Sequence, residues 1–232
     1  MIGPHRPSEL QVMRGQYADP SQDWLRGLHE GSAALGIPLP PGAHDLFRAY
    51  MAELRRWRAT INLNGFTTEQ SILEAGFLDS LACLPALPPG PLRVVDIGSG
   101  AGFPGIPLRL ARPDLSLTLI EANRRRHSFL AHVCRALGLA DVRCLHGRAE
   151  AYAATEGLRG AFDAAFARAV RQVEEAAALA AGFLRPAGLF LSQQGGSGGA
   201  RPSSLTGFGT GRAIPFTVFG RRGVVVAYAK GP

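Results

Sequence analysis

Residues 94–107 read Val-Val-Asp-Ile-Gly-Ser-Gly-Ala-Gly-Phe-Pro-Gly-Ile-Pro. This order predicts a buried strand ending near an acid, then a glycine-rich turn, then the start of a helix. Glycine accepts a positive φ and has no Cβ, so such a turn lets a nucleotide-like cofactor approach the main chain closely. The glycines Gly98, Gly100 and Gly102 have the spacing G-x-G-x-G. The dinucleotide fingerprint G-x-G-x-x-G needs a glycine where Phe103 stands, so the spacing favours S-adenosyl-L-methionine over NAD.

The composition is that of a folded protein with an excess of positive charge. The chain has 232 residues, 46% of them apolar, enough for one domain with an appendage or for two small domains. Its net charge is +7, and Lys230 is the only lysine among 25 basic residues. The base composition of the genome can enrich arginine, but guanidinium groups also bind phosphate well. Together with the glycine turn, this favours a nucleic acid as partner.

The cysteines and the first residues bear on the compartment. Cys83, Cys134 and Cys144 are odd in number and contain no C-x-x-C, so neither a disulfide framework nor a zinc site is indicated. Residues 1–20 lack the apolar core of a signal peptide, and the longest apolar run, 176–184, is too short to span a bilayer. We therefore expect a cytoplasmic protein without a metal and without membrane contact. A monomer is the expected state, although no residue pattern bears on oligomerisation.

The first ninety residues predict a flexible tail over 1–20 and a helical N-terminal cap and linker over 21–91. A helix over about 43–58 has an apolar stripe at three- and four-residue steps, which we interpret as core: Phe47, Tyr50, Leu54 and Trp57. A further helix is expected to begin at Thr67, with Gln70 completing a capping box. Four prolines between residues 85 and 91 indicate the linker.

From residue 92 to 232 strands and helices alternate. This alternation predicts an α/β domain with a doubly wound, mostly parallel sheet. A glycine-rich loop is expected over 193–211, followed by two strands, 212–218 and 223–229, that form an antiparallel hairpin. This ending is typical of class I S-adenosylmethionine-dependent methyltransferases.

Acidic residues stand where such a fold binds its cofactor, at the carboxyl ends of the strands. Asp96 is expected to anchor the methionine half, through the turn amides or the cofactor's ammonium group, or simply to stabilise the turn. Glu121 ends the next strand and could accept both ribose hydroxyls; the alternative is a solvated strand end. Residues 147–150, including Ala149 and Glu150, would pass beneath the adenine.

Arginines surround the same predicted edge. Arg168 follows the fourth strand and could contact cofactor or RNA phosphate, or could be an ordinary arginine at a helix start. Arg124, Arg125 and Arg126 open a helix, where the dipole disfavours cations. An RNA phosphate docked there would explain them, and a solvated helix face is the alternative.

The absence of two motifs argues against two kinds of methyl transfer. No (Asp/Asn)-Pro-Pro-(Tyr/Phe) follows the fourth strand, which argues against methylation of an exocyclic amine, and no Pro-Cys is present, which disfavours attack by a cysteine thiolate. No residue is singled out as a general base. A lone pair such as that of guanine N7 needs none, because positioning and desolvation suffice.

The sequence of residues 96–108 resembles the signature motif of the ribosomal RNA small-subunit methyltransferase G family, also called glucose-inhibited division protein B. The resemblance extends to 62–64, 78–81, 125–126, 129–130, 147–150, 168–169 and 224–230. It implies a helical cap on a class I fold and methyl transfer to N7 of a guanine in the 530 loop of 16S rRNA, free or within the 30S subunit. It also implies that the following residues contact the cofactor: Gly98, Phe103, Ala149, Glu150 and Arg168.

Three departures from the family pattern lie away from the glycine turn. Ala75-Gly76-Phe77 replaces the usual Arg-His, Gln193-Gln194-Gly195 replaces Lys-Gly, and a glycine-rich stretch over 195–211 replaces a charged helix. Two alternatives therefore stay open: a divergent paralogue that methylates another RNA or a small molecule, and a weakly active cofactor-binding RNA module in ribosome assembly.

Overall fold

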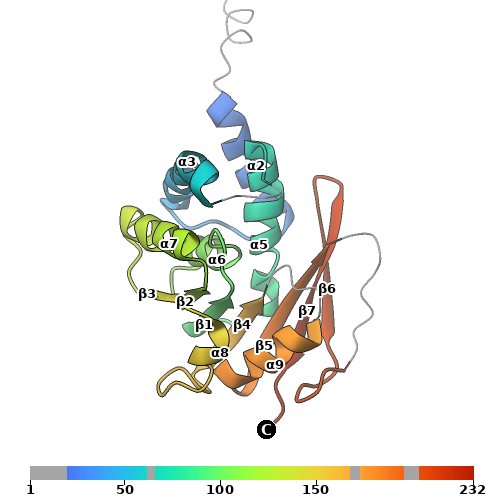
Figure 1. Ribbon diagram of the computed structural model, residues 1–232. Helices are drawn as coiled ribbons and strands as arrows, with labels where there is room; N and C mark the ends of the chain where they lie inside the picture. Colours follow the sequence, from blue (N-terminus) through green and yellow to red (C-terminus); the bar gives the residue numbers. More distant parts are fainter. Residues whose placement is uncertain (1–19, 62–65, 168–172, 196–203) are drawn as a thin grey trace, which may run out of the picture.

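The computed structural model describes residues 20–61, 66–167, 173–195 and 204–232. Within them one sheet has the strand order β3-β2-β1-β4-β5-β7-β6 (Figure 1). Its five parallel strands are β1 (Leu92–Ile97), β2 (Leu115–Glu121), β3 (Val142–His146), β4 (Phe162–Ala167) and β5 (Leu184–Gly195). The strands β6 (Arg212–Val218) and β7 (Arg221–Ala229) pair with each other in antiparallel fashion, and β7 is also antiparallel to β5. The predicted doubly wound sheet with a C-terminal hairpin is confirmed.

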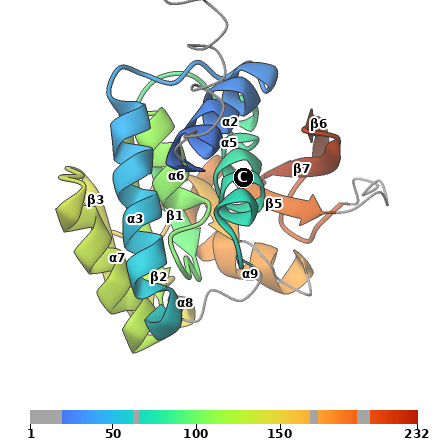
Figure 2. The same ribbon diagram turned by 90° about the horizontal axis from the view of Figure 1, so that it is seen from above.

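Both faces of the sheet are buried by helices. Neighbouring residues of a strand point to opposite faces, and Val94 and Val95 accordingly belong to two different apolar clusters. On the first face α6 (Gly105–Ala111) and α7 (Arg124–Ala136) lie against the strands, and α3 (Ala43–Ile61) packs on both helices. The helix α2 (Pro20–Ala34) belongs to the same apolar cluster (Figure 2). The other face is covered by α8 (Ala149–Tyr152) and α9 (Val173–Phe183). Burial on two sides explains why β1, β2 and β4 are buried almost throughout rather than at every second residue.

The elements before β1 form the part that we call the helical cap. After α2 and α3 come α4 (Glu69–Ser71), the π-helix η1 (Ile72–Leu78), α5 (Asp79–Leu81) and the 3₁₀-helix η2 (Leu84–Ala86). The predicted start at Thr67 was wrong by one residue. Thr68 is the N-cap, because its hydroxyl accepts from the Ser71 amide at 3.1 Å while the Ser71 hydroxyl accepts from the Thr68 amide at 3.0 Å. Gln70 instead donates to Glu74.

The predicted glycine-rich loop begins later than residue 193. Gln193 is paired with Val225 and Gly195 with Gly223, so residues 193–195 extend β5 along the hairpin. Farther on, Phe208 is buried, with its ring centroid 6.0 Å from that of Phe190. Residues 196–203 of this loop, and residues 1–19 of the predicted tail, lie outside the described part. Among the helices described, none has both the length and the apolar character to cross a membrane.

Candidate cofactor site

The glycine turn lies at the carboxyl end of β1 and is tied to the end of β2. The amides of Gly98 and Ser99 both donate to the carbonyl of Ile120, at 2.9 and 3.1 Å. Gly98, Gly100 and Gly102 have φ values of +71°, +60° and +97°. Side chains with a Cβ rarely adopt this region, so the positive φ expected of the three glycines is present in the structure.

The three glycines differ in what surrounds them. A Cβ added to Gly98 would meet nothing within 4 Å, and one added to Gly100 would meet only the Gly98 carbonyl oxygen at 3.9 Å. At Gly102 it would lie 2.5 Å from Ile106 Cδ1 and 2.8 Å from the Tyr50 hydroxyl. Gly98 and Gly100 therefore border open space that a ligand can fill. Gly102 is required by packing within the protein.

Asp96 joins the strand to the following helix. The side chain is fully buried, and its Oδ2 accepts a hydrogen bond of 2.9 Å from the amide of Gly105, the first residue of α6. This contact fixes the far side of the turn. It agrees with the alternative that Asp96 stabilises the turn, while anchoring of the cofactor through the turn amides or the ammonium group stays a prediction.

Glu121 closes on the same turn from β2. Its side chain is buried, its Oε2 accepts from the Gly100 amide at 2.8 Å, and its Oε1 accepts from the Asn123 amide at 2.7 Å. The alternative of a solvated strand end does not agree with this burial. Each carboxylate oxygen can accept more than one hydrogen bond, so the group retains capacity for a hydroxyl-bearing ligand beside the open glycines.

The segment after β3 adjoins Glu121. The amide of Gly147 donates to the main-chain carbonyl of Glu121 at 3.1 Å. Ala149 is buried at the start of α8, whereas Glu150 is exposed. The sequence-predicted residues of the first three strands are thus brought to one edge of the sheet. Arg168 lies outside the described residues.

The three arginines that open α7 have different environments. The Asn123 side chain caps this helix by accepting from the amides of Arg125 and Arg126, at 3.0 and 3.2 Å. The side chains of Arg124 and Arg125 are exposed. Arg126 is half-buried, and its Nε donates to the Ile61 carbonyl at 3.4 Å, which joins α7 to the end of α3.

Tyr50 is a functional candidate that the sequence analysis assigned only to the core. It is fully buried on α3, and its hydroxyl donates to the Ala101 carbonyl at 2.5 Å. The helical cap thereby holds the middle of the glycine turn. The signal that could have revealed it is a single hydroxyl group in an otherwise apolar stripe.

Phe103 points from the turn into the helical cap. Its ring centroid lies 5.8 Å from that of Tyr50, 5.1 Å from that of Phe66 and 6.1 Å from that of Phe77. The ring therefore packs as core, and its main chain is the part that borders the turn. Its predicted contact with the cofactor would thus be made by the backbone.

Two of the departures from the family pattern contact the helical cap or the turn. The expectation that they lie away from the glycine turn is wrong for Gly76, which adjoins Phe103. A Cβ on Gly76 would lie 2.9 Å from Phe103 Cζ, so the glycine makes room for that ring. The Gln193 side chain donates to the Asp79 carbonyl at 2.7 Å, which joins β5 to the cap. Among the residues described, the structure contains no group of three or more His, Cys, Asp or Glu side chains arranged to hold a metal ion.

Comparison with known proteins agrees with this architecture. Among solved structures, that of MtNAS in complex with MTA and tNA is similar over 97% of this chain and 95% of its own, with a TM-score of 0.54 at 16% identity. A mutant of MtNAS in complex with S-adenosylmethionine gives a TM-score of 0.54 at 15% identity, over 99% and 100% of the two chains. At this identity the likeness concerns the fold alone.

Curated relatives are much closer in sequence. Ribosomal RNA small subunit methyltransferase G of Myxococcus xanthus is 38% identical over 168 residues, 72% of this chain and 76% of the relative. The protein of the same name from Sorangium cellulosum is 40% identical over 171 residues, 73% and 71% of the two chains. The family described as "GidB: rRNA small subunit methyltransferase G" matches residues 43–199, from α3 to beyond β5. The chain belongs to the rRNA small subunit methyltransferase G family.

Proposed function

We propose that this protein transfers a methyl group from S-adenosyl-L-methionine to N7 of a guanine in the 530 loop of 16S rRNA. The observation that carries the proposal is the glycine turn closed on a buried acid. Gly98 and Gly100 leave open space, and the Gly100 amide is bonded to Glu121 at 2.8 Å. Family membership supports the class of reaction and of substrate.

The residues of this edge fit the cofactor part by part. The turn from Gly98 to Gly102 would receive the methionine half, since a Cβ there would occupy the ligand's place at two of the three glycines. Glu121 would accept the ribose hydroxyls as charge-assisted hydrogen bonds. Ala149 and Glu150 would border the adenine at the start of α8, and Arg168 is proposed as a further contact.

Methyl transfer to guanine N7 does not require proton transfer by an acidic or basic side chain. Bound S-adenosyl-L-methionine supplies a methyl group on a positively charged sulfur. The N7 lone pair of guanine can attack that methyl without losing a proton. The protein's task is therefore to align nucleophile and methyl group and to exclude water. No side chain needs to be assigned as a catalytic acid or base.

The substrate proposal rests on the charge of the neighbouring surface. Exposed Arg124 and Arg125 begin α7, directly after the strand that ends in Glu121. Guanidinium groups at this edge can pair with RNA phosphates beside the cofactor site. Arg126 belongs to the same proposed surface, although its contact with Ile61 also gives it a structural role. With ribosomal RNA as substrate, we propose that the protein acts in the cytoplasm and as a monomer.

Titration calorimetry with two glycine variants tests the cofactor site. Gly100 and Gly160 have nearly equal φ values, +60° and +61°, and neither would crowd a new Cβ. Gly160 lies before β4, at the opposite end of the sheet from the turn. Gly100→Ala and Gly160→Ala therefore introduce the same backbone strain, about 1 kcal/mol, at different places.

We expect Gly100→Ala to weaken binding of S-adenosyl-L-methionine at least tenfold and Gly160→Ala to leave it within a factor of two. Equal affinities for the two variants, or no binding by the unaltered protein, would contradict the proposed site. A divergent paralogue would give the expected calorimetry but would transfer the methyl group to a different acceptor.

A further inference from the structure

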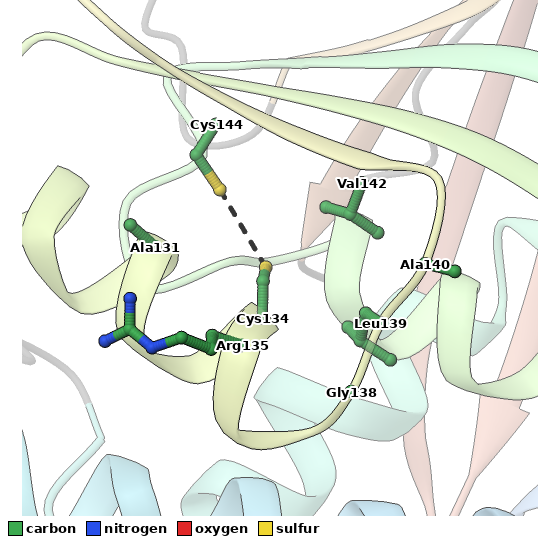
Figure 3. A pocket seen from close by; sticks show the side chains of 8 residues that line it. All are labelled: Ala131, Cys134, Arg135, Gly138, Leu139, Ala140, Val142 and Cys144. Carbon is green, nitrogen blue, oxygen red and sulfur yellow. Dashed lines mark hydrogen bonds between the residues drawn. The ribbon is translucent and has the colours of Figure 1, made fainter.

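Two cysteines that the proposed methyl transfer does not use face each other at the edge of the sheet. Cys134 lies on α7 and Cys144 on β3, and their sulfur atoms are 3.8 Å apart (Figure 3). A disulfide requires about 2.0 Å between the sulfurs. The side chains point toward one another, and the sulfurs must approach by about 1.8 Å to form the bond (Figure 3).

The pair borders a hollow through which a small reagent can reach it. The hollow measures about 500 Å³, and its other lining residues are Ala131, Arg135, Gly138, Leu139, Ala140 and Val142 (Figure 3). β3 is an edge strand of the sheet, so the hollow opens at the molecular surface. Cys134 is buried, whereas Cys144 is only partly buried. Cys144 is therefore the more exposed residue of the pair.

The two thiols are chemically unequal. In the neutral pair either sulfur can donate the shared hydrogen bond. The bond lowers the pKa of Cys144, because a Cys144 thiolate can accept from the Cys134 S–H. The same bond raises the pKa of Cys134, and burial raises it further. The thiolate is the nucleophilic form, so the more exposed cysteine is also the more reactive one.

We propose that Cys134 and Cys144 form a reversible disulfide with a small-molecule disulfide of the glutathione type as oxidant. The Cys144 thiolate attacks one sulfur of that reagent, forms a mixed disulfide and expels one thiolate. The Cys134 sulfur, on losing its proton, then attacks Cys144 and expels the second thiolate. Two protein thiols are oxidised to one disulfide, and one reagent disulfide is reduced to two thiols.

The cross-link has a defined place relative to the cofactor site. β3 ends directly before Gly147 and the start of α8, and α7 begins directly after Glu121 and Asn123. A disulfide thus fixes together the two elements that lead to the proposed adenosine pocket. It also closes the short loop between the cysteines, which restricts the unfolded chain and raises the melting temperature by about 5 °C.

Mapping of the cysteines in the full-length protein tests this directly. The protein is incubated with oxidised or reduced glutathione, the remaining thiols are alkylated, and the peptides are analysed by mass spectrometry. We expect linked Cys134 and Cys144, alkylated Cys83, and reversal by dithiothreitol. Three alkylated cysteines after oxidation, a bond to Cys83, or a bond between two protein molecules would overturn the proposal.

Single substitutions test the order of attack. Cys134→Ser should stop at a stable mixed disulfide on Cys144, whereas Cys144→Ser should leave Cys134 as a free thiol. Cys83→Ser is the matched control and should form the same internal disulfide as the unaltered protein. Equal glutathione labelling of the first two variants would contradict the asymmetry. The mapping of the unaltered protein does not depend on any variant's folding.

Discussion

Two of the junctions between the helical cap and the rest of the molecule differ in chemistry. At the glycine turn, the buried Tyr50 hydroxyl donates to the Ala101 carbonyl, and the Phe103 ring lies among cap aromatics. At the C-terminal hairpin, Arg221 of β7 pairs with Asp79 of α5 at 3.1 Å, and the Arg221 side chain is 40% exposed. Buried groups lose more when a partner is removed than exposed ion pairs do. The comparison implies that the turn junction determines stability and cofactor binding, and that the hairpin junction contributes little.

The largest effect is expected from Gly102→Ala, at the turn junction. A Cβ there would lie 2.5 Å from Ile106 Cδ1 and 2.8 Å from the Tyr50 hydroxyl, and φ is +97°. Both neighbours are fully buried, so they have little room to move. We expect about 3 kcal/mol of lost unfolding free energy, measured by urea denaturation.

Gly98→Ala is the control for this prediction. Its φ of +71° is also positive, although smaller than the +97° of Gly102, and the added Cβ would meet nothing within 4 Å. It should cost about 1 kcal/mol. Equal losses for the two variants would show that packing against Ile106 of α6 and Tyr50 of the cap is not what requires Gly102.

Tyr50→Phe should have the next largest effect. The variant keeps the ring but leaves the buried Ala101 carbonyl without its donor, which costs about 1–2 kcal/mol. Affinity for S-adenosyl-L-methionine should fall several-fold, because the turn is then held less firmly. Urea denaturation and calorimetry measure the two effects.

Tyr152→Phe is the control variant. It removes a similar hydrogen bond, to the His146 carbonyl at 2.9 Å, in exposed surroundings. If this control costs as much stability as Tyr50→Phe, burial is not what makes the Tyr50 hydrogen bond important for stability.

The hairpin junction should show only weak coupling. A double-mutant cycle with Asp79→Ala and Arg221→Ala is expected to give about 0.5–1 kcal/mol, because the arginine is partly exposed. The coupling should shrink further in 1 M salt, since ions screen exposed charges. A coupling above about 2 kcal/mol would show that the hairpin junction contributes as much to the free energy of unfolding as the turn junction.

The smallest effect on stability is expected from Arg124→Ala combined with Arg125→Ala, within about 0.5 kcal/mol, since both side chains are exposed. The double substitution should instead weaken the binding of RNA. The slope of log affinity against log salt concentration, from filter binding with 16S rRNA, should flatten by about 1.5 for two lost phosphate contacts. The pair Arg26→Ala and Arg159→Ala changes the net charge equally at other exposed positions. An unchanged slope for the first pair would assign those arginines to a solvated helix face.

What the sequence predicted well is what neighbouring residues determine. The strand, glycine turn and helix around Gly98, and the alternation after residue 92, follow from local apolar patterns and backbone preferences. The contacts between distant segments were not predictable. Arg221 and Asp79 are 142 positions apart, and Tyr50 and Ala101 are 51 apart. Patterns of spacing carry no information about such pairs, which is why Tyr50 was assigned to the core alone. The pairing of Cys134 with Cys144 was missed as well, because the odd number of cysteines and the absence of C-x-x-C indicated no disulfide.

Transfer of a tritiated methyl group tests the central claim most directly. The protein is incubated with labelled S-adenosyl-L-methionine and, in parallel, with 30S subunits, with naked 16S rRNA and with a mixture of small metabolites; labelled RNA is then digested to nucleosides. The proposal predicts label in 16S rRNA, free or within the subunit, recovered as 7-methylguanosine. Label that appears only in small molecules, or in a nucleoside other than 7-methylguanosine, would contradict it.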